Sequence, residues 1–158
     1  MKQYPASFLK YISIIHRNTS RYFDAVLEPY QIGSGQQFFL RHIYENNGIS
    51  MYDLAQIGQF DKGTVTKAVH KLEELGYVTI AVDENDRRIK HLYATEQTQE
   101  VLEFVYDKRN LWKSSLTKDI SPEKEQELHQ LLEQIAELSC VEIRNAAKQR
   151  EEINDKDN

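Results

Sequence analysis

The chain has 158 residues, of which 40% are hydrophobic and 28% are charged, so a wholly disordered chain is excluded. No apolar run approaches the roughly 20 residues that a membrane span needs, and the N-terminus lacks the long apolar stretch of a signal peptide. The single cysteine, Cys140, excludes an internal disulfide. We therefore expect a cytoplasmic protein that does not interact with membranes.

The net charge of −5 is distributed unevenly along the chain. Residues 121–158 carry ten acidic and five basic side chains, whereas residues 61–95 carry six of each. Binding to phosphates depends on the local potential, so an acidic protein with a basic face can still bind nucleic acid.

Two helices are predicted in the first third of the chain. Apolar residues at spacings of three, four and seven indicate a helix over 5–28, with Pro5 in its first turn. A shorter helix is predicted over 36–46, and the dipeptide Asn47-Gly48 is expected to form its C-cap.

Two more helices are predicted before the middle of the chain. Ser50 and Asp53 resemble a capping box, which places a third helix over 51–57. Asp61 is a good N-cap for a fourth helix that runs to Leu75.

The pattern changes after Gly76, which is a helix stop signal. Residues 77–82 and 89–95 are rich in β-branched and aromatic side chains, and the polar segment 83–88 separates them. This arrangement predicts a β-hairpin.

The helical period returns after the hairpin. Apolar spacing predicts a helix over 96–118, and Ser121-Pro122 begins a last helix of about 28 residues. Residues 151–158 are polar and are expected to form a frayed tail.

This order of elements predicts a mainly α fold with a small β-hairpin wing. A helix, a short connection, a second helix and then a hairpin are typical of a winged helix-turn-helix, here over 31–95. We expect residues 1–158 to form one domain, in which 1–30 and 96–150 supply dimerisation helices.

The fourth helix has one apolar and one polar face. At about 100° per residue, Val65, Val69 and Leu72 fall on the face that packs inward. A polar face with several lysines is also common on ordinary solvated helices. The helix alone therefore leaves DNA contact open. The side chains opposite the apolar face are small, hydroxyl-bearing or charged: Gly63, Thr66, Lys67, His70 and Glu74, flanked by Lys62 and Lys71.

The hairpin tip carries two adjacent arginines, Arg87 and Arg88, near Asp83 and Asp86. A guanidinium at a projecting tip can enter the minor groove, and a carboxylate can orient it through a bidentate pair. A solvated turn with self-compensating charges is the alternative. The basic helix and the arginine tip together are a more specific indication of DNA binding than either feature alone.

These segments resemble the MarR family of bacterial transcriptional regulators. The resemblance lies in DKGTVTK (61–67), LEELGYV (72–78), DENDRR (83–88) and Ala94-Thr95, and it extends to QFFL (37–40). Gly63 stands where the family usually has serine, and Lys67 stands where arginine is common. Since lysine lacks the rigid fork of arginine, the second change affects base specificity more than phosphate binding.

The resemblance implies a homodimer that reads a palindromic operator in double-stranded DNA, most simply as a repressor released by a small ligand. Arg87 or Arg88 would enter the minor groove, with Asp83 and Asp86 orienting the wing. The residues expected at the major groove are Lys62, Gly63, Thr64, Thr66, Lys67 and His70, with Lys71 beside them.

The last helix supports dimerisation independently, because its apolar stripe is too long for so small a domain to cover. Packing of three helices within one chain is the alternative. The resemblance also suggests a pocket for a phenolic or carboxylate effector, and Tyr11, His16, Arg17 and Phe38 are candidates for its lining. These aromatic residues fit a dimer core equally.

No other chemistry is indicated by the sequence. The five histidines form no metal-binding pattern, and we find no nucleophile motif and no phosphate loop, so no cofactor, metal or enzymatic activity is expected. Cys140 is either a structural thiol or a redox sensor. The alternative function is a winged-helix module that binds proteins and not DNA, which neutralisation of the basic face by nearby acids would favour.

Overall fold

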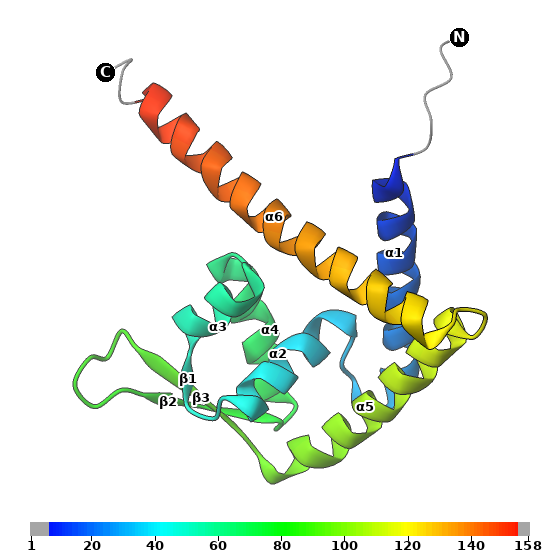
Figure 1. Ribbon diagram of the computed structural model, residues 1–158. Coiled ribbons are helices and arrows are strands. Elements are labelled where there is room, and N and C mark those ends of the chain that lie inside the picture. The colour runs from blue at the N-terminus through cyan, green and yellow to red at the C-terminus, as the bar shows by residue number, and fades with distance from the viewer. Residues whose placement is uncertain (1–6, 155–158) are drawn as a thin grey trace. The chain divides into compact units, whose positions relative to one another are not determined.

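The computed structural model describes residues 7–154 as a mainly helical chain with a small antiparallel sheet (Figure 1). The chain divides into two compact units, the first ending at Asn110 and the second beginning at Leu111. Pro5 of the predicted first helix, and residues 155–158 of the predicted tail, lie outside the described residues.

The first helices begin and end where local hydrogen bonds are available. Helix α1 covers Phe8–Val26 and a short 3-10 helix, η1, covers Glu28–Tyr30. Helix α2 covers Ser34–Glu45 and starts two residues before the predicted position, because Asp24 of α1 accepts a hydrogen bond from the Ser34 amide (2.7 Å).

The predicted C-cap of α2 is wrong by one residue. Asn46 is the C-cap, and Gly48 has a positive φ of 92° in the turn that follows. This turn leads into a strand that the sequence did not predict, β1 (Ile49–Ser50), and the Gly48 amide donates to the carbonyl of Leu92. Two residues are too few to show an alternating pattern.

The third and fourth predicted helices are confirmed. Helix α3 covers Met51–Gly58 and is capped by Ser50, whose hydroxyl accepts from the Asp53 amide at 3.0 Å. Helix α4 covers Lys62–Glu74 and is capped by Asp61.

The predicted hairpin is also confirmed, as part of a three-stranded antiparallel sheet in the order β1-β3-β2. Strand β2 covers Val78–Val82 and β3 covers Lys90–Ala94, with Ile80 opposite Leu92. Residues 83–88 join them and form the tip of the wing, which projects from the helices of the first unit (Figure 1).

The core of the first unit lies between the helices and the inner face of the sheet. Helix α5 covers Glu96–Thr117, and its first half belongs to this core because Val101 and Val105 are buried. The first unit, called the winged unit below, therefore includes the first half of α5. The largest fully buried side chains among the described residues are Leu27, Phe39, Leu40, Ile43, Leu54, Val65, Val69, Leu72, Val78, Leu92, Val101 and Val105.

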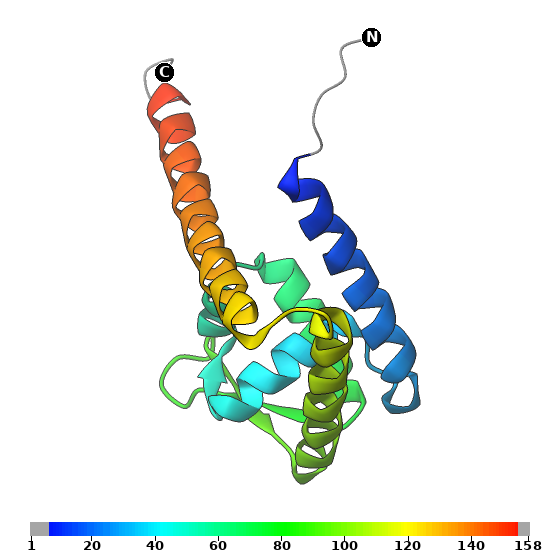
Figure 2. The same ribbon diagram turned by 45° about the vertical axis from the view of Figure 1, so that its right-hand side comes forward.

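The second unit consists of the end of α5 and the long helix α6, Pro122–Asn154 (Figure 2). Lys113 and Glu125 form an ion pair of 2.5 Å between the two helices. The 33 residues of α6 exceed the predicted length, and the helix includes residues 151–154 of the expected tail. No helix in the described part of the chain is long and apolar enough to cross a membrane.

Gly76 lies in the turn that connects α4 to β2. Its φ is +80°, a conformation that costs a residue with a Cβ atom about 1–2 kcal/mol. We expect Gly76→Ala to lower the free energy of unfolding by that amount in urea titrations. Gly35→Ala, in a helix with open space around the position, is the control and should not destabilise the protein. Equal effects of both changes would show that the positive φ of Gly76 is not the source of the cost.

Candidate nucleic-acid interface

The exposed face of α4 carries two lysines without acidic partners. The predicted inward face is confirmed, since Val65, Val69 and Leu72 are at most 1% exposed. On the outer face Lys62 and Lys67 are exposed, and among residues 7–154 neither has a hydrogen-bond or ion-pair partner through its side chain. These amines are therefore available to an anionic partner.

The other two basic residues of this face are close to acids one turn ahead. His70 Nδ1 lies 3.1 Å from Glu73 Oε2, and Lys71 Nζ lies 4.0 Å from Glu74 Oε2. All four side chains are at least 42% exposed, so solvent weakens these pairs. An incoming phosphate would compete with them easily.

The side chain of Asp61 caps the N-terminal end of α4. Asp61 accepts hydrogen bonds from the Thr64 amide (2.9 Å) and the Thr64 hydroxyl (2.6 Å). The hydroxyl bond and the amide bond lower the pKa of Asp61, which keeps its carboxylate ionised. Thr66 donates to the Lys62 carbonyl at 2.7 Å. Both threonine hydroxyls thus act toward a partner mainly as acceptors.

Gly63 lies in the first turn of α4, beside the capping carboxylate. A Cβ atom at this position would lie 3.1 Å from Asp61 Oδ1, so that carboxylate would have to shift by a few tenths of an ångström to admit a side chain. The absence of a side chain leaves the backbone there open to a close partner.

The wing loop is organised by its two aspartates. Asp83 accepts from the amides of Asn85 (2.8 Å) and Asp86 (2.9 Å). Asp86 holds Arg88 in a bidentate pair, with distances of 3.0 Å to Nε and 2.8 Å to Nη2. This side-chain contact is the main cause that lowers the pKa of Asp86. Arg88 is oriented in this way while its side chain stays 90% exposed.

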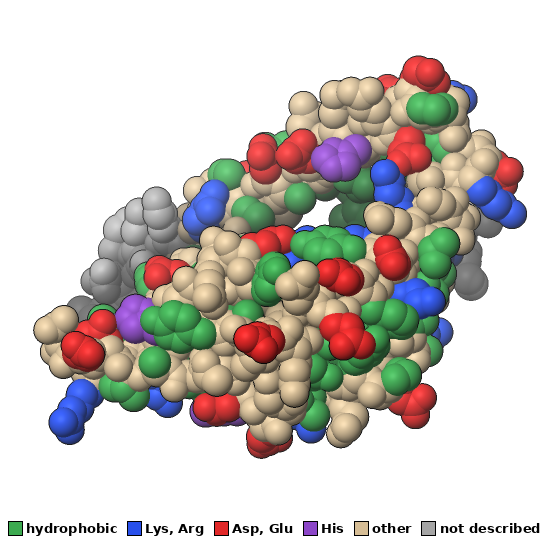
Figure 3. Space-filling model, turned by 90° about the horizontal axis from the view of Figure 1, so that it is seen from below, with side chains coloured by type: hydrophobic (Ala, Val, Ile, Leu, Met, Phe, Trp, Pro, Cys, Tyr) green, Lys and Arg blue, Asp and Glu red, His purple; other side chains and the backbone are tan. Residues whose placement is uncertain are grey.

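Arg87, the other arginine of the tip, is exposed and has no side-chain partner among the described residues. Basic side chains project from the end of the wing in Figure 3. The sequence reasoning missed Lys90, which is exposed on β3. The one feature of the sequence that could have indicated Lys90 is its position two residues after Arg88.

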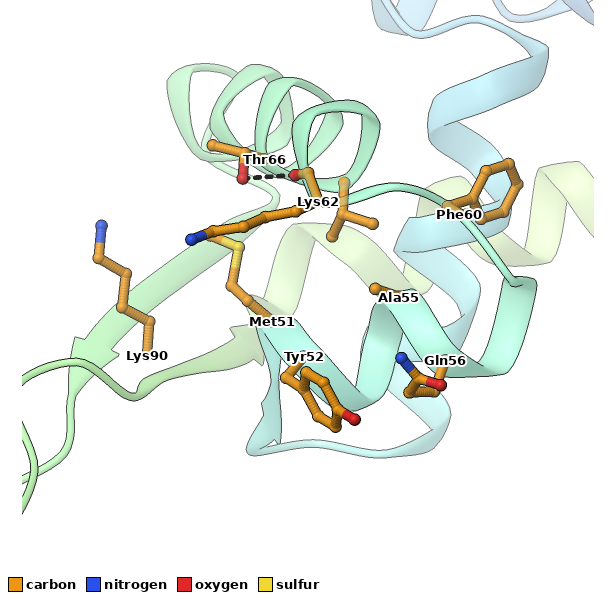
Figure 4. A pocket seen from close by; sticks show the side chains of 9 residues that line it. Met51, Tyr52, Ala55, Gln56, Phe60, Lys62, Thr66 and Lys90 are labelled. Carbon is orange, nitrogen blue, oxygen red and sulfur yellow. Dashed lines mark hydrogen bonds between the residues drawn. The ribbon is translucent and has the colours of Figure 1, made fainter. Parts of the chain in front are cut away.

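A hollow of about 600 Å³ lies between α3, the start of α4 and β3 (Figure 4). Most of its lining is apolar, and Lys62 and Lys90 supply positive charge. Its volume is in the range of small-molecule sites. The lining residues are Met51, Tyr52, Ala55, Gln56, Phe60, Lys62, Val65, Thr66 and Lys90.

The expected effector residues are not brought together in this chain. Tyr11, His16 and Arg17 lie exposed on α1, and Arg17 bonds Ser13 of the same helix. Phe38 of α2 packs instead on Phe60 at 5.3 Å. No hydrogen bond or ring contact between residues 7 and 154 joins the first three side chains to Phe38. Within the same range no three His, Cys, Asp or Glu side chains gather as a metal site.

Comparison with known proteins places the chain in a family. Residues 36–89 match a model of the MarR family. The HTH-type transcriptional regulator BilQ of Clostridioides difficile is 28% identical over 72% of this chain and 77% of its own. The solved MarR transcriptional regulator of Methanosarcina mazei is 32% identical, with a TM-score of 0.77 over 82% of this chain and 94% of its own.

A third similarity concerns the fold alone. The S. aureus MepR-DNA complex is 20% identical, with a TM-score of 0.75 over 83% of this chain and 97% of that one. The winged fold, the exposed basic face of α4 and the matches over most of both chains agree with one another. The chain belongs to the MarR family of transcriptional regulators.

Proposed function

We propose that the protein is a homodimer that binds a palindromic site in double-stranded DNA. Helix α4 would enter the major groove and the wing tip the minor groove. The observation that carries this proposal is that Lys62, Lys67 and Arg87 have no acidic partner in the described part of the chain. A module that binds only proteins was expected to have the Lys62/Lys67 face and both wing arginines neutralised, and of these only Arg88 is paired with an acid, Asp86, in the described part of the chain.

The roles of the side chains follow from their chemistry. Lys62 and Lys67 would bind phosphates, while Thr64 and Thr66 would accept hydrogen bonds from base edges and Gly63 would allow the backbone close to the DNA. His70 and Lys71 would exchange their acidic neighbours for phosphates. The fold of MepR, solved as a complex with DNA, supports this arrangement.

The minor groove would be read by the wing. Arg88, fixed by Asp86, has the smaller orientational entropy to lose, and Arg87 adds a free charge beside it. A narrow minor groove has an enhanced negative potential, which favours a guanidinium.

Dimerisation would use the exposed apolar side chains of the second unit and α1. Leu131 is 50% exposed, Leu138 62% and Ile143 69%, which leaves a long apolar stripe on α6 in the single chain. On α1, Phe8 and Ile15 are more than half exposed. Uncovered stripes of this length normally mean a partner helix.

Regulation by an aromatic carboxylate would use the hollow beside α4. Its apolar lining suits a ring, and Lys62 and Lys90 suit the carboxylate. A ligand there would occupy Lys62 and lie against Thr66, and so would compete with DNA. We therefore place the effector here in preference to Tyr11, His16, Arg17 and Phe38. The protein would act as a cytoplasmic repressor that such a ligand releases.

DNA binding is tested by gel shifts on the gene's own upstream DNA and on a random-sequence pool at two salt concentrations. Lys62→Ala/Lys67→Ala should weaken binding to all sequences and make the salt dependence less steep. Arg88→Ala should cost about 1–3 kcal/mol of binding free energy on the specific site. Lys118→Ala/Lys124→Ala removes the same charge elsewhere and is the control. Equal losses in the control, or no shift at all, would refute the interface and favour the protein-binding module.

Dimerisation is tested on Leu131 and Ile135, one turn apart on the α6 stripe. Changing both to Asp places charges in the expected apolar interface and should yield monomers in sedimentation velocity. Gln126→Asp/Gln130→Asp adds the same charges on the polar face and should leave the dimer intact. A dimer that persists in the first variant would show that the interface lies elsewhere.

The effector site is tested by NMR with benzoate as the probe. Met51 gives a single assignable methyl signal in the hollow, which benzoate should shift and benzamide should not. Lys62→Gln/Lys90→Gln should weaken the response about tenfold, the effect of losing a charged hydrogen bond of about 1.5 kcal/mol. Release of DNA by benzoate with an unmoved Met51 signal would place the effector elsewhere.

A further inference from the structure

His91 lies at the base of the wing, in the central strand β3, where it is opposite Ser50 of β1 and Ala81 of β2. Its Nδ1 atom is 2.9 Å from the carbonyl oxygen of Gly48, and its Nε2 atom is 3.1 Å from Asp83 Oδ2. One ring thus links the turn before β1 to the wing loop.

The two contacts of His91 require that both ring nitrogens carry a proton. A neutral imidazole has one N–H group and can donate only once, whereas the imidazolium donates twice. The Gly48 carbonyl and the ionised Asp83 carboxylate can only accept. Both contacts are therefore satisfied only when His91 is protonated.

Asp83 carries this contact into the wing loop. Its other oxygen accepts the amides of Asn85 and Asp86 that shape the turn. These backbone bonds, the one from Asp86 first, and the His91 contact lower the pKa of Asp83. Protonated His91 therefore completes a chain of hydrogen bonds from Gly48 to the turn that places Arg88.

The charges around His91 favour its protonated form. Asp83 faces it from the wing and Asp53 from α3, while Lys90 lines the same hollow of about 440 Å³ from β3. The bond to Gly48 and then the bond to Asp83 raise the pKa of His91 above its ordinary 6.5. Since the pKa is raised by folding, both contacts are complete at lower pH, and one is lost as the pH rises through the raised value.

We propose that His91 is a positioning residue whose protonated ring fixes the wing, so that the affinity for DNA falls as the pH rises. The proposal rests on the proposed function, because it assigns a role within DNA binding. It adds a proton-dependent contact at the base of the wing, separate from the contact of His70 with Glu73 on α4.

The first test uses the free protein and needs no DNA. In a pH titration followed by NMR, the His91 ring should titrate above 6.5, and the amide signals of 83–88 should shift with it. Asp83→Asn keeps an oxygen for the amides of the turn and presents an NH₂ group to His91. Neutral His91 can accept from that group and still donate to Gly48, so its titration should move to lower pH.

The second test measures DNA affinity at fixed ionic strength between about pH 6 and about pH 8. We expect wild-type affinity to fall about threefold to tenfold, since linkage limits the change to about tenfold per pH unit for each proton taken up. In a His70→Gln background, which removes the other histidine of the proposed interface, His91→Gln and Asp83→Asn should flatten this profile. His129→Gln, a change on α6 outside the winged unit, should keep the wild-type profile.

The role of His91 and the proposed function fail on different outcomes. Specific binding with the same pH profile in wild type, His91→Gln and Asp83→Asn would overturn the role of His91, as would titration of His91 at or below 6.5. Absence of specific DNA binding at every pH would overturn the proposed function itself. The co-titration of His91 and the wing amides would even then decide whether the contact exists.

Discussion

The burial of one face of α4 determines what the protein can present to a partner. Val65, Val69 and Leu72 are packed against the core, which fixes the rotation of the helix about its axis. With that rotation fixed, Lys62 and Lys67 point outward together. A buried Leu typically contributes about 2–5 kcal/mol of stability relative to Ala, whereas a surface ion pair contributes about 0–1 kcal/mol. Turning the lysines of α4 inward would therefore cost more free energy than new ion pairs could supply.

The wing is held by hydrogen bonds and not by a core of its own. Asp83 and Asp86 organise the loop through backbone amides and one guanidinium, all at the surface. Such bonds are modest in net free energy, which makes the loop easier to reorganise than α4. The rigid helix α4 is therefore suited to fix the position of the protein along the DNA. The more adaptable wing loop is suited to adjust to the shape of the minor groove.

The sequence predicted elements well wherever the signal was local. The caps Ser50 and Asp61 and the stop at Gly76 lie within a turn of the elements they bound, and each occurs as expected. Contacts between distant residues left no such signal. The cap of α2 by Asp24, the pairing of β1 with β3 and the bridge made by His91 join segments that only the fold brings together.

The same distinction applies to the candidate site. Helical phase was enough to place the basic face of α4, and the tip arginines follow from the hairpin. The pairs of His70 with Glu73 and of Lys71 with Glu74 are also local, because residues three apart on a helix are neighbours. Phase could not show the hollow beside α4, since its lining comes from three elements.

The net charge of −5 is a poor guide to what this protein binds. Ten of its acidic groups follow residue 120, whereas Lys62, Lys67 and Arg87, which have no side-chain partner within residues 7–154, all belong to the winged unit. Exposed charges separated by more than about 10 Å are largely screened at 0.1 M salt. A phosphate at α4 therefore responds to the few side chains within that distance. Whether those side chains are paired or free decides the affinity, and this is why their partners matter more than the charge of the whole chain.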